Sequence, residues 1–160
     1  MKKVEIRQQT ADDWRVVREV RLAALQDAPF AFGSTYESAR RYDEATWRSR
    51  LSNSDNPTFL AFDGERAVGM DGVYLHEGEH TLVAMWVAPS ARRSGVGAAL
   101  TRAVLDWATA RGARRVLLGV AEDNGPAQRL YERLGFKLTG RSEPLHSDPS
   151  RRVLEMAREL

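Results

Sequence analysis

The sequence predicts one α/β domain, α+β in detail, in which a mixed and mostly antiparallel sheet is flanked by helices. Short apolar strand-like runs alternate with stretches whose apolar residues recur at the 3.6-residue period of a helix. Glycine, proline and asparagine mark the boundaries between them. The length of 160 residues suits a single domain, residues 1–160, with a sizeable core. The expected order is β-α-α-β-β-β-α-β-α-β-β.

The first elements are a strand over residues 3–7 and a helix that begins after Thr10. Asp13 follows three residues later, in the manner of a capping box. The apolar stripe of this helix consists of Trp14, Val17, Val20, Ala24 and Leu25. We expect an aromatic loop over residues 30–36 and a second short helix over residues 43–51.

A hairpin comes next, with strands over residues 58–62 and 67–76 joined at Asp63-Gly64. A third strand, residues 81–87, leads into a long helix that should end at Gly112, because glycine is favoured just after a helix. Residues 115–121 are rich in β-branched residues and leucine, which favours another strand.

The last part of the chain begins with a short helix at Asn124-Gly125-Pro126, where the proline suits the first turn. Gly135 should end this helix. A strand over residues 136–141, a polar loop over residues 142–150 and a final strand over residues 151–159 complete the predicted sheet.

The composition excludes several classes of protein. Lys and Arg number 24 against 22 for Asp and Glu, and they are spread along the chain, so a nucleic-acid partner is not expected. The absence of cysteine excludes disulfides and thiol catalysis. The three histidines do not cluster, so we expect no metal site. No run is long enough to span a membrane, and no signal peptide is recognisable, which favours a cytoplasmic protein.

The segment 85–100 carries the strongest chemical signal. A strand ends at Ala88-Pro89, Arg92 and Arg93 follow, and Gly95 and Gly97 precede an amphipathic helix. Glycines allow a ligand to approach the main chain closely, and the first turn of a helix attracts phosphate. The two arginines add charge and forked donors. We interpret this segment as a pyrophosphate cradle, although a tight turn with solvated arginines is the simpler alternative.

The order of residues in the cradle narrows the kind of phosphate-binding motif that it can be. It lacks the Gly-Lys-Ser/Thr ending of a P-loop, and Leu100 stands where a dinucleotide fingerprint needs its third glycine. Instead, Arg92 to Gly97 reads Arg-x-x-Gly-x-Gly, which resembles the acetyl-CoA signature of the GNAT superfamily of N-acetyltransferases. Asn124-x-x-Ala127-x-x-Leu130-Tyr131-x-x-x-Gly135-Phe136 is similar to that family's second hallmark. The resemblance covers nearly the whole chain in its order of elements.

The resemblance implies acetyl-CoA as co-substrate. The residues that would bind it are Trp86, Val87, Arg92, Arg93, Ser94, Gly95, Val96, Gly97, Ala98, Asn124 and Ala127. By family likeness, the backbone of Trp86 and Val87 should pair with the pantetheine arm where the sheet splays. Trp86 could equally be a core residue, and Asn124 a helix cap.

Tyr131 is the candidate catalytic acid. It lies four residues after Ala127, in the motif that should line the cofactor groove, and a phenol with a pKa of about 10 can protonate a departing thiolate. The alternative is a core tyrosine. A general base is harder to find, because residues 83–87 and 116–120 contain no acid. Glu122, Glu155 and Glu37 are the remaining candidates, and a water chain or a backbone carbonyl could also serve.

The acceptor wall is expected in the segment from Phe30 to Trp47, which combines aromatic and acidic side chains that suit a cationic amine. Phe32, Tyr36 and Glu37 are the candidate substrate residues, with a purely structural role as the alternative. The leading hypothesis is therefore transfer of an acetyl group to a primary amine of a small molecule. Acetylation of a protein N-terminus or lysine, a non-catalytic acyl-CoA sensor and a DNA-binding regulator are the alternatives. A homodimer remains open.

Overall fold

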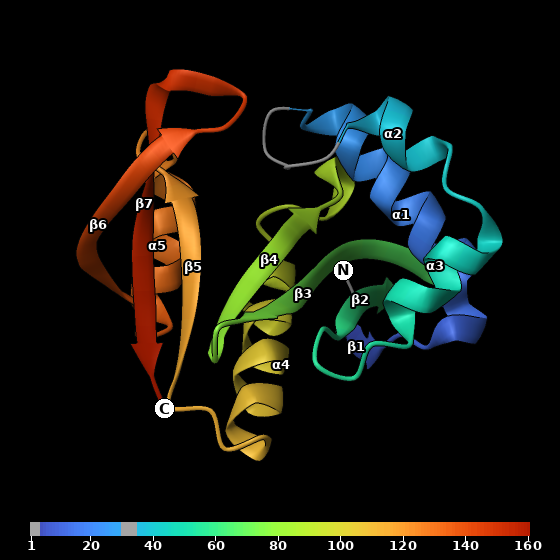
Figure 1. The fold of residues 1–160 in the computed structure, drawn as a ribbon, viewed down its shortest axis with the longest axis horizontal. Helices are drawn as coiled ribbons and strands as arrows, with labels where there is room; N and C mark the ends of the chain where they lie inside the picture. Colours follow the sequence, from blue (N-terminus) through green and yellow to red (C-terminus); the bar gives the residue numbers. More distant parts are fainter. Residues whose placement is uncertain (1–3, 30–34) are drawn as a thin grey trace.

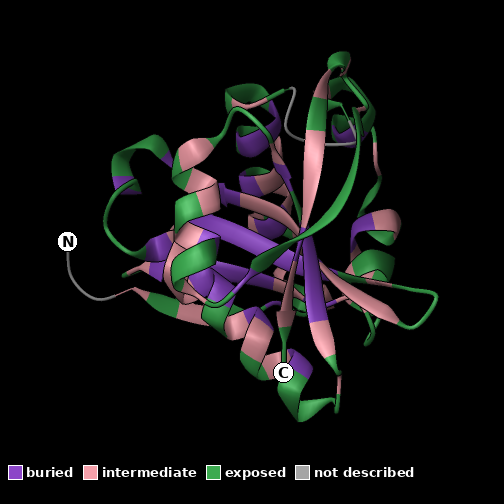
Figure 2. Cartoon of the chain, turned by 90° about the vertical axis from the view of Figure 1, so that its left-hand side faces the viewer, coloured by how far each residue is buried: buried purple, intermediate pink, exposed green. Residues whose placement is uncertain are grey.

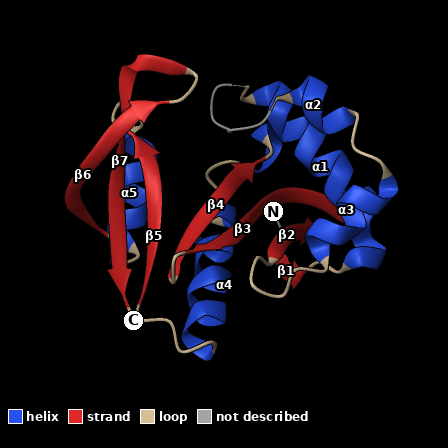
Figure 3. Cartoon of the chain, in the orientation of Figure 1, coloured by secondary structure: helices blue, strands red, loops and turns tan. Residues whose placement is uncertain are grey.

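The structure is a computed structural model that describes residues 4–29 and 35–160. Its strands are β1 (Glu5–Gln8), β2 (Thr58–Asp63), β3 (Arg66–His76), β4 (Glu79–Val87), β5 (Arg115–Ala121), β6 (Lys137–Leu145) and β7 (Asp148–Glu159). Its helices are α1 (Trp14–Asp27), α2 (Tyr36–Arg40), α3 (Glu44–Leu51), α4 (Val96–Ala110) and α5 (Gly125–Arg133). Figure 3 shows how the helices flank the strands.

The seven strands form one sheet in the order β1-β2-β3-β4-β5-β7-β6. All neighbouring pairs are antiparallel except β4 and β5, which are parallel. The predicted class, a mixed and mostly antiparallel sheet flanked by helices, is therefore confirmed. The parallel pairing is short, because only His80 with Val116 and Thr81 with Leu117 are in register. Beyond these residues β4 and β5 diverge, as Figure 1 shows.

Helices cover both faces of the sheet. A Cβ built on Gly69 would lie 3.1 Å from side-chain atoms of Val96 and Leu100, so this face of β3 meets α4. The next residue along β3, Met70, is in register with Trp86, whose indole bonds Asp27 at the end of α1. Because successive residues of a strand point to opposite faces, α4 and α1 cover opposite sides.

The predicted start of the first helix is confirmed in its capping chemistry. The Thr10 amide donates to Asp13 Oδ2 at 2.7 Å, and the reciprocal half of the capping box is also present. Val17, Val20 and the rest of the buried stripe of α1 face the core. The first strand is shifted slightly, to Glu5–Gln8, and Lys3 lies outside the described residues.

The predicted order of elements is wrong in one respect, because three helices precede β2 instead of two. Residues 36–40 form the short helix α2, where Thr35 Oγ1 accepts a hydrogen bond from the Ser38 amide at 3.1 Å. This cap stabilises a single turn whose sequence is too short to show helical periodicity. The next helix, α3, begins at its own cap, Asp43, whose Oδ1 accepts from the Thr46 amide at 2.8 Å.

The predicted loop over residues 142–150 is also wrong. β6 continues to Leu145 and β7 begins at Asp148, so only a tight turn separates them. Nearly every residue of β6 is exposed, because this edge strand packs little apolar surface, and the apolar alternation that marks a strand is therefore missing. Figure 2 shows burial concentrated in the middle of the sheet and exposure along this hairpin.

Candidate active site

The main cleft lies where β4 and β5 diverge, and its volume is about 1520 Å³. Residues of α1, α3, β3, β4, β5 and α5 line it. Pockets for one small ligand are usually about 300–1,000 Å³, so this cleft has room for two substrates side by side. The parting of β4 and β5, expected only by resemblance, is thus a property of the structure.

The loop before α4 presents free donors. Residues 92–95 are exposed, Arg93 and Gly95 adopt positive φ values of 63° and 84°, and the first helical hydrogen bond runs from the Ala99 amide to Gly95 O. The amides of residues 96–98 therefore have no backbone acceptor within the described chain, as at any helix start. This geometry fits an anion, because unpaired N–H groups and the positive end of a 15-residue helix coincide.

Arg92 is held by other residues of the chain. Its guanidinium contacts Asp27 Oδ2 at 2.5 Å and donates from Nε to Val87 O at 3.1 Å. The indole of Trp86, which is 8% exposed, donates to the same carboxylate oxygen at 2.9 Å. These two donors hold the pKa of Asp27 below its usual value. Arg92 thus ties the cradle to α1, and direct contact of Arg92 with phosphate stays a prediction.

Gly97 lies at a close approach between helices. A Cβ at this position would lie 3.2 Å from Leu130 Cδ2 and 3.9 Å from Val87 Cγ2. The glycine therefore brings α4 close to α5 and to the end of β4. The cradle and the second predicted motif are in this way direct neighbours in space.

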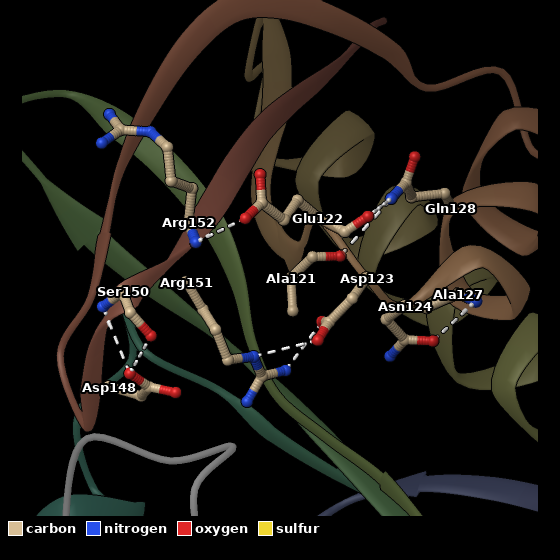
Figure 4. Close-up of polar contacts among 10 residues, drawn as sticks. All are labelled: Ala121, Glu122, Asp123, Asn124, Ala127, Gln128, Asp148, Ser150, Arg151 and Arg152. Carbon is tan, nitrogen blue, oxygen red and sulfur yellow. Dashed lines mark hydrogen bonds and ion pairs between the residues drawn. The ribbon is translucent and has the colours of Figure 1, made fainter.

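The second motif begins with a helix cap. Asn124 Oδ1 accepts a hydrogen bond from the Ala127 amide at 3.2 Å, and both residues line the cleft. Gln128 donates to the main chain at the end of β5, while Arg151 of β7 forms a two-point ion pair with Asp123 (Figure 4). These contacts fix the start of α5 against the strands. Asn124 is thus a cap, and its use of the amide group for a ligand stays a prediction.

Tyr131 lies on α5. Its side chain packs in the core and also lines the cleft. It is 6% exposed and meets Phe136 edge-on, with 5.7 Å between ring centroids. Its hydroxyl has no hydrogen-bond partner within the described chain. Burial, and to a lesser degree the nearby charge of Asp71, raise the pKa of this phenol well above its usual value. Tyr131 therefore keeps its proton throughout the neutral range.

Comparison with known proteins decides the family. The family model described as "Acetyltransferase (GNAT) family" matches residues 20–136, well over half of the chain. The chain belongs to the GNAT family. This confirms the resemblance stated from the two sequence motifs.

Individual relatives agree with this assignment. A mycothiol acetyltransferase from Geodermatophilus obscurus is 41% identical over 85 residues, which are 49% of this chain and 28% of that protein. The ribosomal-protein-alanine N-acetyltransferase from Brucella melitensis superposes with a TM-score of 0.77 at 18% identity, covering 98% of this chain and 99% of its own. The PaiA N-acetyltransferase from Thermoplasma acidophilum, solved in complex with coenzyme A, gives 0.74 at 19% identity and 99% coverage of both.

The first curated relatives are longer proteins, and this chain spans under half of their length. The two structural neighbours above establish the GNAT fold. The name of the Brucella melitensis protein gives ribosomal-protein alanine as its acceptor, and the name of the PaiA protein gives no acceptor.

Two of the three expected acceptor residues, Tyr36 and Glu37, lie apart from the cleft. Tyr36 and Glu37 belong to α2 and do not line it, and the Glu37 carboxylate is paired with Arg40 at 3.0 Å. Phe32 lies outside the described residues. Instead, Arg21, Trp47 and Arg50 form this wall of the cleft. A substrate role for Phe32, Tyr36 and Glu37 therefore remains a prediction.

The candidate bases all have structural partners. Glu122 Oε1 accepts from the Arg152 amide at 3.2 Å, as Figure 4 shows, and Glu155 accepts from the Thr139 hydroxyl at 3.0 Å. Glu37 is the carboxylate paired with Arg40. None of the three lines the cleft.

Sequence reasoning missed Asp71. This residue of β3 is 1% exposed, lines the cleft, and has no hydrogen-bond partner within the described chain for either carboxylate oxygen. The signal that could have found it is an acid inside the apolar run of residues 67–76. The residues predicted as candidate bases are Glu122, Glu155 and Glu37, none of which lies on β3.

Among the described residues, no group of three or more histidine, aspartate or glutamate side chains is placed to hold a metal ion. None of the helices in residues 4–29 and 35–160 has the length and apolarity needed to cross a bilayer.

Proposed function

We propose that this GNAT protein transfers the acetyl group of acetyl-CoA to a primary amine by direct attack within a ternary complex. The observation that carries the proposal is the continuity of the cleft, which joins Asn124, Ala127 and Tyr131 on one side to Trp47 and Met70 on the other. A single cavity can therefore hold both reactants next to the buried phenol of Tyr131, which lines it. Proximity of this kind is the largest part of what acetyl transfer requires.

The cradle is proposed to bind the pyrophosphate of acetyl-CoA. The free amides of residues 96–98 supply donors, and the exposed side chain of Arg93 supplies charge. The remaining binding residues would be those of the loop, Ser94, Gly95, Val96, Gly97 and Ala98, together with the backbone of Trp86 and Val87 and the Asn124 and Ala127 side of the cleft. The end of β4 beside the gap has main-chain groups that β5 does not pair.

The proposed chemistry conserves every proton. The amine nitrogen attacks the acetyl carbon, a C–N bond forms, and the C–S bond breaks. Tyr131 donates its proton to the departing thiolate, and the proton that the nitrogen loses restores the phenol, so the products are an amide and a thiol. The raised pKa of Tyr131 ensures that the proton is present at neutral pH.

A small molecule is the proposed acceptor. The acceptor side of the cleft is formed by Trp47, Met70 and the partly buried Arg21, which suits a compact amine that also carries an acceptor of hydrogen bonds. A polypeptide N-terminus is the second candidate, since it would reach the same cleft from the rim. We further propose that the protein is cytoplasmic. A homodimer is proposed as an alternative to a monomer.

A panel of amines tests the proposal. Purified protein is incubated with acetyl-CoA and, in turn, spermidine, L-lysine, an amine-bearing antibiotic and an alanine-initiated hexapeptide, and released thiol is followed. We expect turnover with at least one of the first three at rates well above the amine-free control. Turnover of the peptide alone would favour the second candidate. Absence of thiol release with every amine, despite acetyl-CoA binding, would favour a non-catalytic sensor.

A further inference from the structure

Asp71 is placed in a position that a folded protein normally avoids. Its carboxylate is 1% exposed, and neither oxygen accepts a hydrogen bond from the described chain. A buried polar group without a partner costs stability, and an ionised one costs more. Such a group persists where a ligand supplies the missing partner, which makes Asp71 a candidate for function.

The backbone directs Asp71 into the cleft. Met70 pairs with Trp86 and Gly72 pairs with Val83, so Asp71 faces two residues of β4, Ala84 and Met85, instead of one. Ala84 has a positive φ of 59°, as expected for a β-bulge. The bulge breaks the ordinary alternation of β4 opposite Asp71. Met70, Asp71 and Gly72 of β3 all line the same cavity.

The indole nitrogen of Trp47 is also buried without a hydrogen-bond partner within the described chain. Within the described chain, the buried side-chain atoms without a hydrogen-bond partner are the two oxygens of Asp71 and the indole nitrogen of Trp47. Trp47 lines the same cleft. The residues that carry the unused donor and the unused acceptors therefore line one cavity, as expected beside a site for a polar ligand.

The charges around the cleft leave Asp71 without a cation. The charged groups that line it besides Asp71 are Arg21, Asp27 and Arg50 on the acceptor side and Asp123 and Arg151 at the far rim. None of them offsets the effect of burial, which alone raises the pKa of Asp71 well above its usual value. The remaining titratable groups are Tyr74 and Tyr131, and Tyr131 is close enough to be affected by the Asp71 charge.

We propose that Asp71 is the carboxylate that receives the ammonium group of the acceptor in the cleft and takes its proton. This rests on the proposed function, and it supplies the general base that residues 83–87 and 116–120 lack. Binding is favourable because the ammonium brings three donors and a positive charge to a carboxylate that has neither.

The proton balance of this step is simple. The ammonium enters with the ionised carboxylate, one N–H proton moves to Asp71, and the amine is left neutral with its lone pair free. Nitrogen then attacks the thioester as described above. A carboxyl group with a raised pKa is a better base than an ordinary aspartate, so burial makes the transfer easier.

The first test compares Asp71→Asn with wild type, using whichever amine of the panel turns over fastest. Asparagine keeps the shape but cannot take the proton. We expect kcat near neutral pH to fall by roughly 10²–10⁴-fold while acetyl-CoA affinity is unchanged. The rate of the variant should rise about tenfold per pH unit, because it depends on amine already deprotonated in solution, whereas wild type should level off. The control is Asp106→Asn, an exposed aspartate on α4, which should behave as wild type.

The second test needs no substrate. A carboxyl whose folded pKa is raised makes the fold less stable as pH rises from its unfolded pKa, about 3.9, towards the folded value. The melting temperature of wild type should therefore fall relative to Asp71→Asn as pH rises above about 3.9. An aspartate with a structural role would behave in the opposite way, with the variant melting lower. Asp71→Leu repeats the comparison if the asparagine variant does not fold.

The outcomes separate this proposal from the proposed function. Turnover by wild type supports acetyl transfer whatever Asp71 does. Equal kcat and an equal pH profile in wild type and Asp71→Asn would overturn the role of Asp71 alone. If no amine is acetylated, the proposed function fails, and the melting comparison still decides whether Asp71 is unpaired. An Asp71→Asn variant that melts below wild type at about pH 8 would overturn the proposed role of Asp71.

Discussion

Replacing Tyr131 by Phe separates its two possible roles. Phe keeps the ring, and with it the edge-on contact to Phe136 at 5.7 Å, and removes a hydroxyl that has no hydrogen-bond partner within the described chain. We therefore expect the free energy of unfolding to change by at most about 0.5 kcal/mol, or about 2 °C in Tm for a domain of this size. The lost proton should lower kcat by roughly 10²-fold or more.

The assay is thiol release against pH, with acetyl-CoA affinity measured by calorimetry. Because burial raises the pKa of Tyr131, the alkaline fall of the wild-type rate should lie above about pH 10, the usual value for a phenol, and the Phe variant should lack it. Tyr42→Phe, which removes a hydroxyl outside the cleft, is the matched control. If Tyr131→Phe retains the wild-type kcat and the same alkaline limb, Tyr131 is only a packing residue.

Three other substitutions test the cradle and the sheet beside it. Gly97→Asp should weaken acetyl-CoA binding by at least about tenfold in calorimetry, because it adds a carboxylate to an anion site. Gly97→Ala displaces only the flexible Leu130 and should weaken binding less. Equal affinities of the two variants for acetyl-CoA would refute the cradle. Arg92→Ala should lower acetyl-CoA affinity and also cost up to about 1 kcal/mol of stability through the half-exposed pair with Asp27. Since the pKa of Asp27 is lowered, that stability should be present at neutral pH and lost as pH falls through the folded pKa, and a Tm difference that grows in acid would contradict it. Gly72→Ala places a Cβ 2.8 Å from Pro57 O and should cost about 1–3 kcal/mol in thermal unfolding, while an unchanged Tm would mean that the backbone yields there.

The sequence was sufficient for elements that carry a local signal. Thr10 and Asp13 predicted the first helix, and Asp63-Gly64 predicted the hairpin of β2 and β3, because caps and turns depend on neighbours in the chain. It was insufficient for α2, a single capped turn, and for the β6–β7 turn. Both lie at the surface, where hydrophobic periodicity carries no information.

The residues of the site also divide into those that the sequence predicts and one that it does not. The glycines and the start of α5 are short-range motifs, and the structure brings them together through the contact of Gly97 with Leu130. Asp71 could not be recognised by the same reasoning, because its distinction is the absence of partners. That depends on a bulge in the neighbouring strand and on burial by distant helices, neither of which a single residue in a run reveals.

The short pairing of β4 and β5 has a consequence for amide hydrogen exchange. Past Thr81, β4 has a paired neighbour on one side only, so alternate amides point towards β3 and towards the gap. Exchange along this strand should therefore be slow and fast in alternation, interrupted at Ala84 by the bulge. A ligand that lies in the gap as an extra strand would slow the fast set alone. Amide exchange rates along β4 would thus show, residue by residue, whether a ligand occupies the gap between β4 and β5, before any acceptor is known.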